Sequence, residues 1–232
     1  MRRVDYNNAR KLCIAAAKNN KNVLLIGTHG IGKTYLVTEV AEKLGLKMGY
    51  WSASTMDPYI DLVGVPHVND EGKLSFAMRE DIFDMEFLFF DELNRAPIKV
   101  RNSVLELVQF QRINERELPK LKMVWAAINP PTDDYQVEEL DPALKDRFHI
   151  HTEMKPSPDY DYLATQMEDK TAEKILAWWN GLNDEDQEKI TPRRLEYIGS
   201  CFDLGFNPKD IVHEPISKPA VELLVSSLKR KT

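Results

Sequence analysis

Short apolar runs alternate along the first two thirds of the chain with stretches whose apolar residues recur at helical spacing. The runs at residues 23–26, 87–90 and 123–128 are continuously apolar, which is typical of parallel strands buried on both faces. Two further strands are predicted at residues 47–52 and 148–152. The helical stretches predict helices at residues 6–18, 33–44, 98–109 and 141–146. Strands alternating with helices predict a parallel five-stranded α/β sheet with crossover helices.

The pattern changes at residues 155–158, which read Lys-Pro-Ser-Pro. Everything beyond this point reads as helical, so we expect an α/β domain over residues 1–155 and a small helical domain over residues 156–232. Inside the first domain, the turn signal Asn-Asp-Glu-Gly at residues 69–72 predicts a small hairpin over residues 63–76.

The composition is that of an ordinary globular protein, with 43% hydrophobic residues among 232. The net charge of −6 does not favour a general binder of nucleic acid. The two cysteines, Cys13 and Cys201, have no metal-binding or redox spacing. The chain opens without an apolar signal region, and no stretch approaches membrane-spanning length. We therefore expect a cytoplasmic protein that does not contact membranes.

Residues 27–34 follow the first apolar run and read Gly-Thr-His-Gly-Ile-Gly-Lys-Thr. Between a strand and a helix, this pattern is typical of a phosphate-binding loop, because glycines let backbone N–H groups turn toward a phosphate and the helix adds its positive dipole end. Lys33 can bind the β- and γ-phosphates, whereas we assign no side-chain chemistry to His29. With the strand-end residue Asp91, the predicted nucleotide-binding residues are Gly27, Thr28, His29, Gly30, Ile31, Gly32, Lys33, Thr34 and Asp91.

Nucleotide hydrolysis also needs a metal ion, an oriented water molecule and positive charge. Thr34 and Asp91 are the predicted Mg²⁺ ligands, the latter through water, because Asp91 ends a buried strand at the carboxyl edge of the sheet. Glu92 follows and can act as the general base on the attacking water. Asn129 ends the next apolar run, and its amide can bind the γ-phosphate or the water, although taken alone it is equally well a loop residue.

Two arginines could complete such a site. Arg147 and Arg193 carry permanent charge and can bind phosphate in a fork, but each could equally be a surface residue of a helix. His149 and His151 share one face of a predicted strand, and no third metal ligand is evident. A solvent-facing strand edge is therefore favoured over a metal site for this pair.

In this order the motifs resemble those of AAA+ ATPases, most closely the MoxR-like group, which is related to dynein, magnesium chelatase and the McrB restriction GTPase. The phosphate loop alone is generic. The run Asp-Glu-Leu-Asn-Arg-Ala at residues 91–96 is specific, because it is similar to the group's Asp-Glu-Ile-Asn-Arg-Ala signature. Three further segments are similar to motifs of the group. Residues 127–130 resemble its sensor 1, residues 140–148 resemble the segment that ends in its arginine finger, and residues 191–193 resemble its sensor 2.

The resemblance implies a role for each of these residues. Asp91 and Glu92 would be the Walker B pair, and Asn129 would be sensor 1. Arg147 would reach the nucleotide of a neighbouring subunit, and Arg193 would act in its own chain from a helical lid. The predicted catalytic residues are thus Glu92, Asn129, Arg147 and Arg193. The resemblance also implies assembly of the chain into a homo-hexameric ring.

We therefore expect a P-loop NTPase fold with a helical lid and an ATPase that uses ATP and Mg²⁺. The AAA+ module accounts for the given sequence, so the target is expected to be another protein, and the family resemblance implies chaperone-like work, often with a von Willebrand factor A domain partner. One alternative is a nucleic-acid motor of the McrB or helicase-loader kind, which the acidic balance disfavours. A second alternative is a nucleotide-dependent scaffold with little hydrolysis.

Overall fold

The computed structural model describes residues 3–131, 139–212 and 218–229, which form two compact units. Unit 1 contains Ala9–Gly27 and Lys33–Glu153. Unit 2 contains Arg3–Asn8, Thr28–Gly32 and the described part of Met154–Thr232. The middle of the predicted phosphate loop is thus grouped with unit 2, whereas its two ends belong to unit 1.

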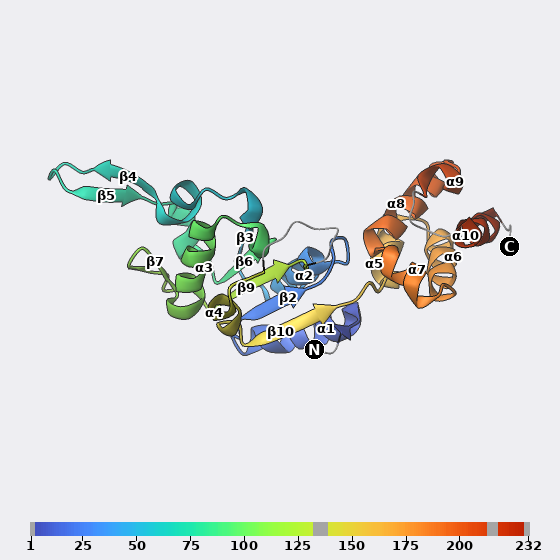
Figure 1. The fold of residues 1–232 in the computed structure, drawn as a ribbon, viewed down its shortest axis with the longest axis horizontal. Coiled ribbons are helices and arrows are strands. Elements are labelled where there is room, and N and C mark those ends of the chain that lie inside the picture. The colour runs from blue at the N-terminus through green and yellow to red at the C-terminus, as the bar shows by residue number, and fades with distance from the viewer. Residues whose placement is uncertain (1–2, 132–138, 213–217, 230–232) are drawn as a thin grey trace. The chain divides into compact units, whose positions relative to one another are not determined.

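Five strands of unit 1 (Figure 1) and the two-residue strand β1 form a six-stranded sheet. Its order is β1 (Arg3–Val4), β10 (Ile150–Met154), β2 (Val23–Ile26), β9 (Met123–Ile128), β6 (Phe87–Asp91) and β3 (Met48–Ser52). The pairs β10–β2, β2–β9, β9–β6 and β6–β3 are parallel. The five predicted strands are confirmed. The sheet has one strand more than predicted, because the two residues of β1 are too few to show a periodicity.

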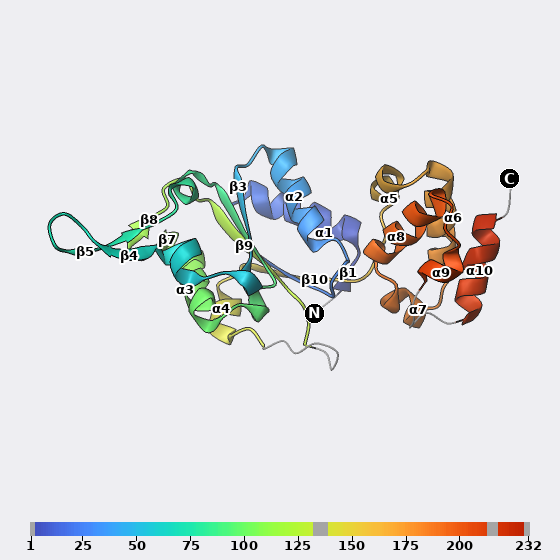
Figure 2. The ribbon, with the colours of Figure 1, turned by 90° about the horizontal axis from the view of Figure 1, so that it is seen from above.

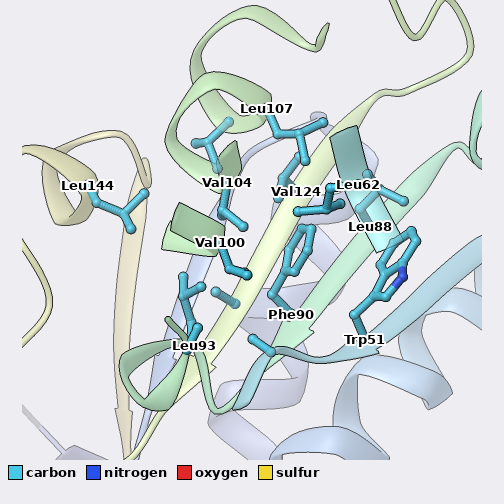
Figure 3. Close-up of a cluster of buried hydrophobic side chains, with 14 of the residues drawn as sticks. Trp51, Leu62, Leu88, Phe90, Leu93, Val100, Val104, Leu107, Val124 and Leu144 are labelled. Carbon is cyan, nitrogen blue, oxygen red and sulfur yellow. The ribbon is translucent and has the colours of Figure 1, made fainter. Parts of the chain in front are cut away.

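Helices cover both faces of this sheet, with α3 (Ile98–Phe110) and α4 (Pro142–Asp146) on one face and α1 (Tyr6–Lys18) and α2 (Lys33–Leu44) on the other (Figure 2). The apolar residues of α3 recur every three or four positions and so form one stripe. Figure 3 shows this stripe against the central strands. The residues of the cluster include Val100, Val104, Leu107, Leu88, Phe90 and Val124.

Two antiparallel hairpins extend unit 1. The first pairs β4 (Val65–Val68) with β5 (Leu74–Ala77), close to the predicted hairpin, and its turn is closed by the Asn69 side chain, which accepts two backbone N–H groups. The second pairs β7 (Arg112–Ile113) with β8 (Arg116–Glu117) and was not predicted. Its two turn residues have positive φ, which is typical of a tight hairpin turn. The described part of unit 1 also contains four short helical turns: η1 (Ala53–Thr55), η2 (Pro58–Val63), η3 (Glu80–Asp84) and η4 (Leu93–Arg95).

Unit 2 is helical and has a core of its own. Its helices are α5 (Tyr160–Gln166), α6 (Asp169–Asn180), α7 (Asp184–Lys189), α8 (Pro192–Asp203), α9 (Pro208–Ile211) and α10 (Lys218–Lys229). Ile175, Ile198 and Leu224, from three of these helices, are fully buried together. No helix in the described part of the chain combines the length and the apolar character needed to cross a bilayer.

Candidate nucleotide-binding site

The phosphate loop connects β2 to α2 and turns at two glycines. Gly30 and Gly32 have φ of +74° and +90°, which lie in the region that side chains rarely adopt. Each is also crowded within unit 2, because a Cβ on Gly30 would lie 2.9 Å from Oγ1 of Thr191 and a Cβ on Gly32 would lie 3.3 Å from the Tyr6 ring. The backbone conformation therefore favours glycine at both positions, and at Gly30 a Cβ would also force Thr191 to shift.

Lys33 begins α2 and is only 7% exposed. Its Nζ donates hydrogen bonds to the carbonyl of Gly27 at 2.6 Å and to Oδ1 of Asn129 at 3.0 Å. A buried ammonium group is costly unless it is hydrogen-bonded, so these bonds hold the charge at the end of β2. The structure thus brings Lys33 and Asn129, which are far apart in the sequence, into direct contact.

Thr34 follows on α2 and donates its hydroxyl hydrogen to Oδ2 of Asp91 at 2.6 Å. Asp91 is the last residue of β6, and its Oδ1 accepts the backbone N–H of Glu92 at 2.9 Å. Hydroxyl and carboxylate oxygens are the hard ligands that Mg²⁺ takes beside nucleotide phosphates and water. The donor set therefore fits Mg²⁺. Among the described residues, no group of three His, Cys, Asp or Glu side chains could hold a metal ion by itself.

Glu92 leaves β6 in a left-handed backbone conformation, with φ 55° and ψ 37°. Such a conformation costs a residue with a Cβ about 1 kcal/mol, and strain of this kind clusters at functional sites. The carboxylate has two partners, because Oε2 accepts a hydrogen bond from Oγ of Ser54 at 3.1 Å and Oε1 lies 3.4 Å from the Arg95 guanidinium. Glu92 is thus held beside Asp91 but by a different set of groups.

Tyr50 lies near this acidic pair on the edge strand β3. Its pKa is raised above the usual value, first by burial, then by the negative charges of Asp91 and Glu92, and by a hydrogen bond to Asp91. The phenol therefore stays protonated and can donate to the carboxylate over the physiological pH range.

Asn129 comes directly after β9 and is 2% exposed. Its backbone is bound twice by the side-chain amide of Asn94, which lies in the turn η4 after Glu92. Nδ2 of Asn94 donates to the Asn129 carbonyl at 2.9 Å, and Oδ1 of Asn94 accepts the Asn129 N–H at 3.4 Å. The carboxyl ends of β6 and β9 are therefore joined beyond their backbone pairing.

Arg147 lies near the amino ends of β10 and β2, the opposite end of the strands from Lys33. It caps the C-terminal end of α4, and β10 begins soon afterwards, with Ile150 paired to Val23 at the start of β2. Lys33 and Asn129, by contrast, follow the carboxyl ends of their strands. The Arg147 guanidinium donates to Oε1 of Gln109 at 3.2 Å. Within one chain, Arg147 is thus separated from Lys33 by the length of a strand.

Arg193 belongs to unit 2, together with the middle of the phosphate loop. Its backbone N–H donates to the carbonyl of Gly30 at 3.1 Å. Thr191 caps α8 by accepting the N–H of Arg194, and Pro192 is the first residue of that helix, the position that proline favours. The Thr-Pro-Arg segment therefore begins a helix in contact with the loop.

The histidine pair has structural partners. Nδ1 of His149 accepts the backbone N–H of Asn22 at 3.0 Å, and Nε2 of His151 donates to the carbonyl of Lys145 at 2.9 Å. Each ring thus has one hydrogen bond to the backbone.

The family model described as "ATPase family associated with various cellular activities (AAA)", AAA_3, matches residues 22–150, more than half of the chain. Chaperone MoxR1 of Mycobacterium tuberculosis is 30% identical over 146 residues, which cover 60% of this chain and 37% of that protein. Protein MoxR of Paracoccus denitrificans is 30% identical over 145 residues, which cover 60% and 42%.

The chain belongs to the MoxR-like AAA+ ATPases. It spans about two fifths of the length of these curated relatives. Its fold is similar to that of NtrX from Brucella abortus, with a TM-score of 0.57, 13% identity, and coverage of 94% of this chain and 56% of the other. It is also similar to the Thermotoga maritima RuvB Holliday junction branch migration motor, with a TM-score of 0.51, 18% identity, and coverage of 95% and 67%. Likeness at such identity concerns the fold alone.

Three residues of this MoxR-like site were not singled out from the sequence: Tyr50, Ser54 and Asn94. Asn94 lies inside the Asp-Glu-Leu-Asn-Arg-Ala run, so its place in a specific motif was the available signal. Tyr50 and Ser54 carry no such signal. They reach the acidic pair only because β3 pairs with β6, with Ser52 opposite Asp91.

Proposed function

We propose that the chain is a ring-forming, Mg²⁺-dependent ATPase that remodels a partner protein. One observation carries this proposal: the hydrogen bonds that join Lys33 to Asn129 and Thr34 to Asp91 at one edge of the sheet, with Glu92 adjacent. A phosphate-binding lysine, a pair of metal-binding side chains, a base and a polar amide thus lie together at this edge of the sheet. Phosphoryl transfer to water requires this combination of groups.

The residues divide the chemistry between them. The loop N–H groups and Lys33 hold the phosphates, and Thr34 and Asp91 hold the metal and its water. Bound Mg²⁺ would neutralise charge on the β- and γ-phosphates. Glu92 accepts a proton from the attacking water, and the Asn129 amide orients that water or the γ-phosphate.

The ring part of the proposal is supported by Arg147. Its place at the far edge of the sheet keeps it from the nucleotide of its own chain, and family resemblance makes it the arginine finger for a neighbour. An arginine supplied across an interface can raise hydrolysis by ~10³-fold or more. Turnover would therefore depend on assembly, with a hexamer as the expected ring.

Residues 156–232 are proposed as a lid, with Arg193 as the residue that senses nucleotide. The contact between the Arg193 backbone and Gly30 supports this role. The partner is proposed to be a protein because a relative at 30% identity is named a chaperone, and family resemblance points to a von Willebrand factor A domain.

Phosphate release from Mg²⁺-ATP by wild-type protein and by Glu92→Gln tests this function. We expect Glu92→Gln to bind ATP yet lose ~100-fold or more in rate, because it lacks the base. Glu42→Gln, exposed on α2, is the matched control and should turn over normally. An unchanged rate in Glu92→Gln would remove Glu92 as the base. ATP binding by the assembled wild type without hydrolysis would instead indicate a nucleotide-dependent scaffold.

A further inference from the structure

Two buried asparagines join β6 to β9, and the mechanism above uses only one of them. Asn94 is 3% exposed and binds both the carbonyl and the N–H of Asn129 through its side-chain amide. A carboxamide offers a donor and an acceptor side by side, as a peptide group does. Asn94 therefore continues the β6–β9 ladder after its last backbone pair, Phe90 with Ala126.

The side chain of Asn129 lies at the other end of this connection. Its Oδ1 accepts the hydrogen bond from Lys33, so the direction of this amide depends on where the Asn129 backbone is held. Reacting groups must be held within a fraction of an ångström of the productive geometry. We infer that Asn94 is a positioning residue, which fixes the backbone of Asn129 so that the Asn129 amide meets the γ-phosphate or the attacking water. This inference rests on the proposed ATPase function.

Four substitutions separate the amide's chemistry from its bulk. Asn94→Asp keeps the shape but loses the donor and places a carboxylate oxygen against the Asn129 carbonyl, in a buried place. Asn94→Ala removes both hydrogen bonds without adding charge. Asn94→Gln keeps the amide with one more methylene group. Asn102→Asp makes the same change as the first at an exposed position on α3 and is the matched control.

Steady-state ATP hydrolysis gives the first readout, with thermal unfolding to select folded variants. We expect Asn94→Asp and Asn94→Ala to lose ~10-fold or more in kcat, while KM for ATP rises by a smaller factor, because a misplaced Asn129 amide costs more in the transition state than in the bound state. Asn94→Gln should recover part of the rate, and Asn102→Asp should match the wild type.

A double-mutant cycle distinguishes positioning from a general structural role. If Asn94 acts through the Asn129 amide, then adding Asn94→Ala to Asn129→Ala should lower kcat by less than about twofold further. Full additivity of the two losses would overturn the inference. So would an Asn94→Ala variant with wild-type kcat.

A second readout does not depend on hydrolysis. We divide the dissociation constant for ADP by that for the slowly hydrolysed analogue ATPγS. This ratio should exceed one in the wild type and should fall about threefold or more in Asn94→Ala, because the γ-phosphate contact is lost. Wild-type protein that binds both nucleotides but hydrolyses nothing would defeat the proposed function, and this ratio would still decide the role of Asn94. An unchanged ratio in Asn94→Ala, in protein that discriminates the two ligands, would overturn the inference alone.

Discussion

The hydroxyl of Thr34 and the carboxylate of Asp91 lie 2.6 Å apart, the first at the start of α2 and the second at the end of β6. A shared Mg²⁺ would take the Thr34 hydroxyl oxygen as a ligand and would be held by Asp91 through a water molecule. We expect Thr34→Val, which keeps the shape but loses the oxygen, to raise the Mg²⁺ concentration for half-maximal ATP hydrolysis by ~10-fold or more. Thr34→Ser should stay near the wild type. A magnesium titration of ATPase activity measures both, and an unchanged Thr34→Val curve would exclude Thr34 as a ligand.

The left-handed backbone of Glu92 predicts a conflict between stability and activity. Replacing it with glycine relieves about 1 kcal/mol of strain and costs about half of that in chain entropy. We expect Glu92→Gly to raise the free energy of unfolding by about 0.5 kcal/mol while hydrolysis is lost. Gln111, with φ 53° and ψ 37° at the end of α3, is the matched control. Gln111→Gly should stabilise similarly and leave turnover intact, as urea unfolding and ATPase assays would report.

The sequence predicted the parallel strands and their helices well because their signals are local. A run such as 123–128 is apolar at every position, and the structure buries all of β9. The order of the strands was not predicted in detail, and β1 and the β7–β8 hairpin were missed. These elements have two residues per strand, so they depend on their neighbours rather than on a periodicity.

The same distinction between local signals and long-range contacts applies to the candidate site. Lys33, Thr34 and Asp91 could be named from motif spacing alone, and the structure joins Thr34 to Asp91 and Lys33 to Asn129 by hydrogen bonds. Ser54 could not be named, because its relation to Glu92 comes from the pairing of β3 with β6 and from the turn that follows β3. Contacts made across strands that are distant in sequence need the sheet order, which a single sequence does not contain.

Cys13 predicts an alkaline loss of stability. Burial on α1 raises the pKa of its thiol from 9.0 to about 12, so above pH 9 the unfolded chain releases a proton that the folded chain keeps. The contribution of this thiol to the free energy of unfolding is constant below pH 9. Between pH 9 and pH 12 it decreases by up to about 1.4 kcal/mol per pH unit. Urea unfolding at pH 8 to 10.5 should show a shallower decline in Cys13→Ala than in the wild type. Parallel curves for the two proteins would contradict this.

The β4–β5 hairpin should be separable from the ATPase core. Val68 and Leu74, a register pair next to its turn, are each 69% exposed, so exchanging the five residues between them for Asn-Gly should remove no core packing. We expect basal ATP hydrolysis and assembly to persist. Because the exposed hairpin is a candidate contact for the target, we expect stimulation by a partner protein to be reduced. Loss of assembly would place the hairpin in the ring instead, and unchanged stimulation would argue against a target contact.

Arg147 gives the sharpest test of the ring. Arg147→Ala lacks the proposed finger and Glu92→Gln lacks the base, so each alone should be nearly inactive. In an equimolar random mixture, roughly one interface in four combines an intact Glu92 with a neighbour's intact Arg147. We therefore expect about a quarter of the wild-type rate to return on mixing. Arg116→Ala, an exposed arginine on β8, is the control and should be active alone. If Arg147 served its own chain, every subunit would lack one group, and mixed rings confirmed by native mass spectrometry would stay inactive.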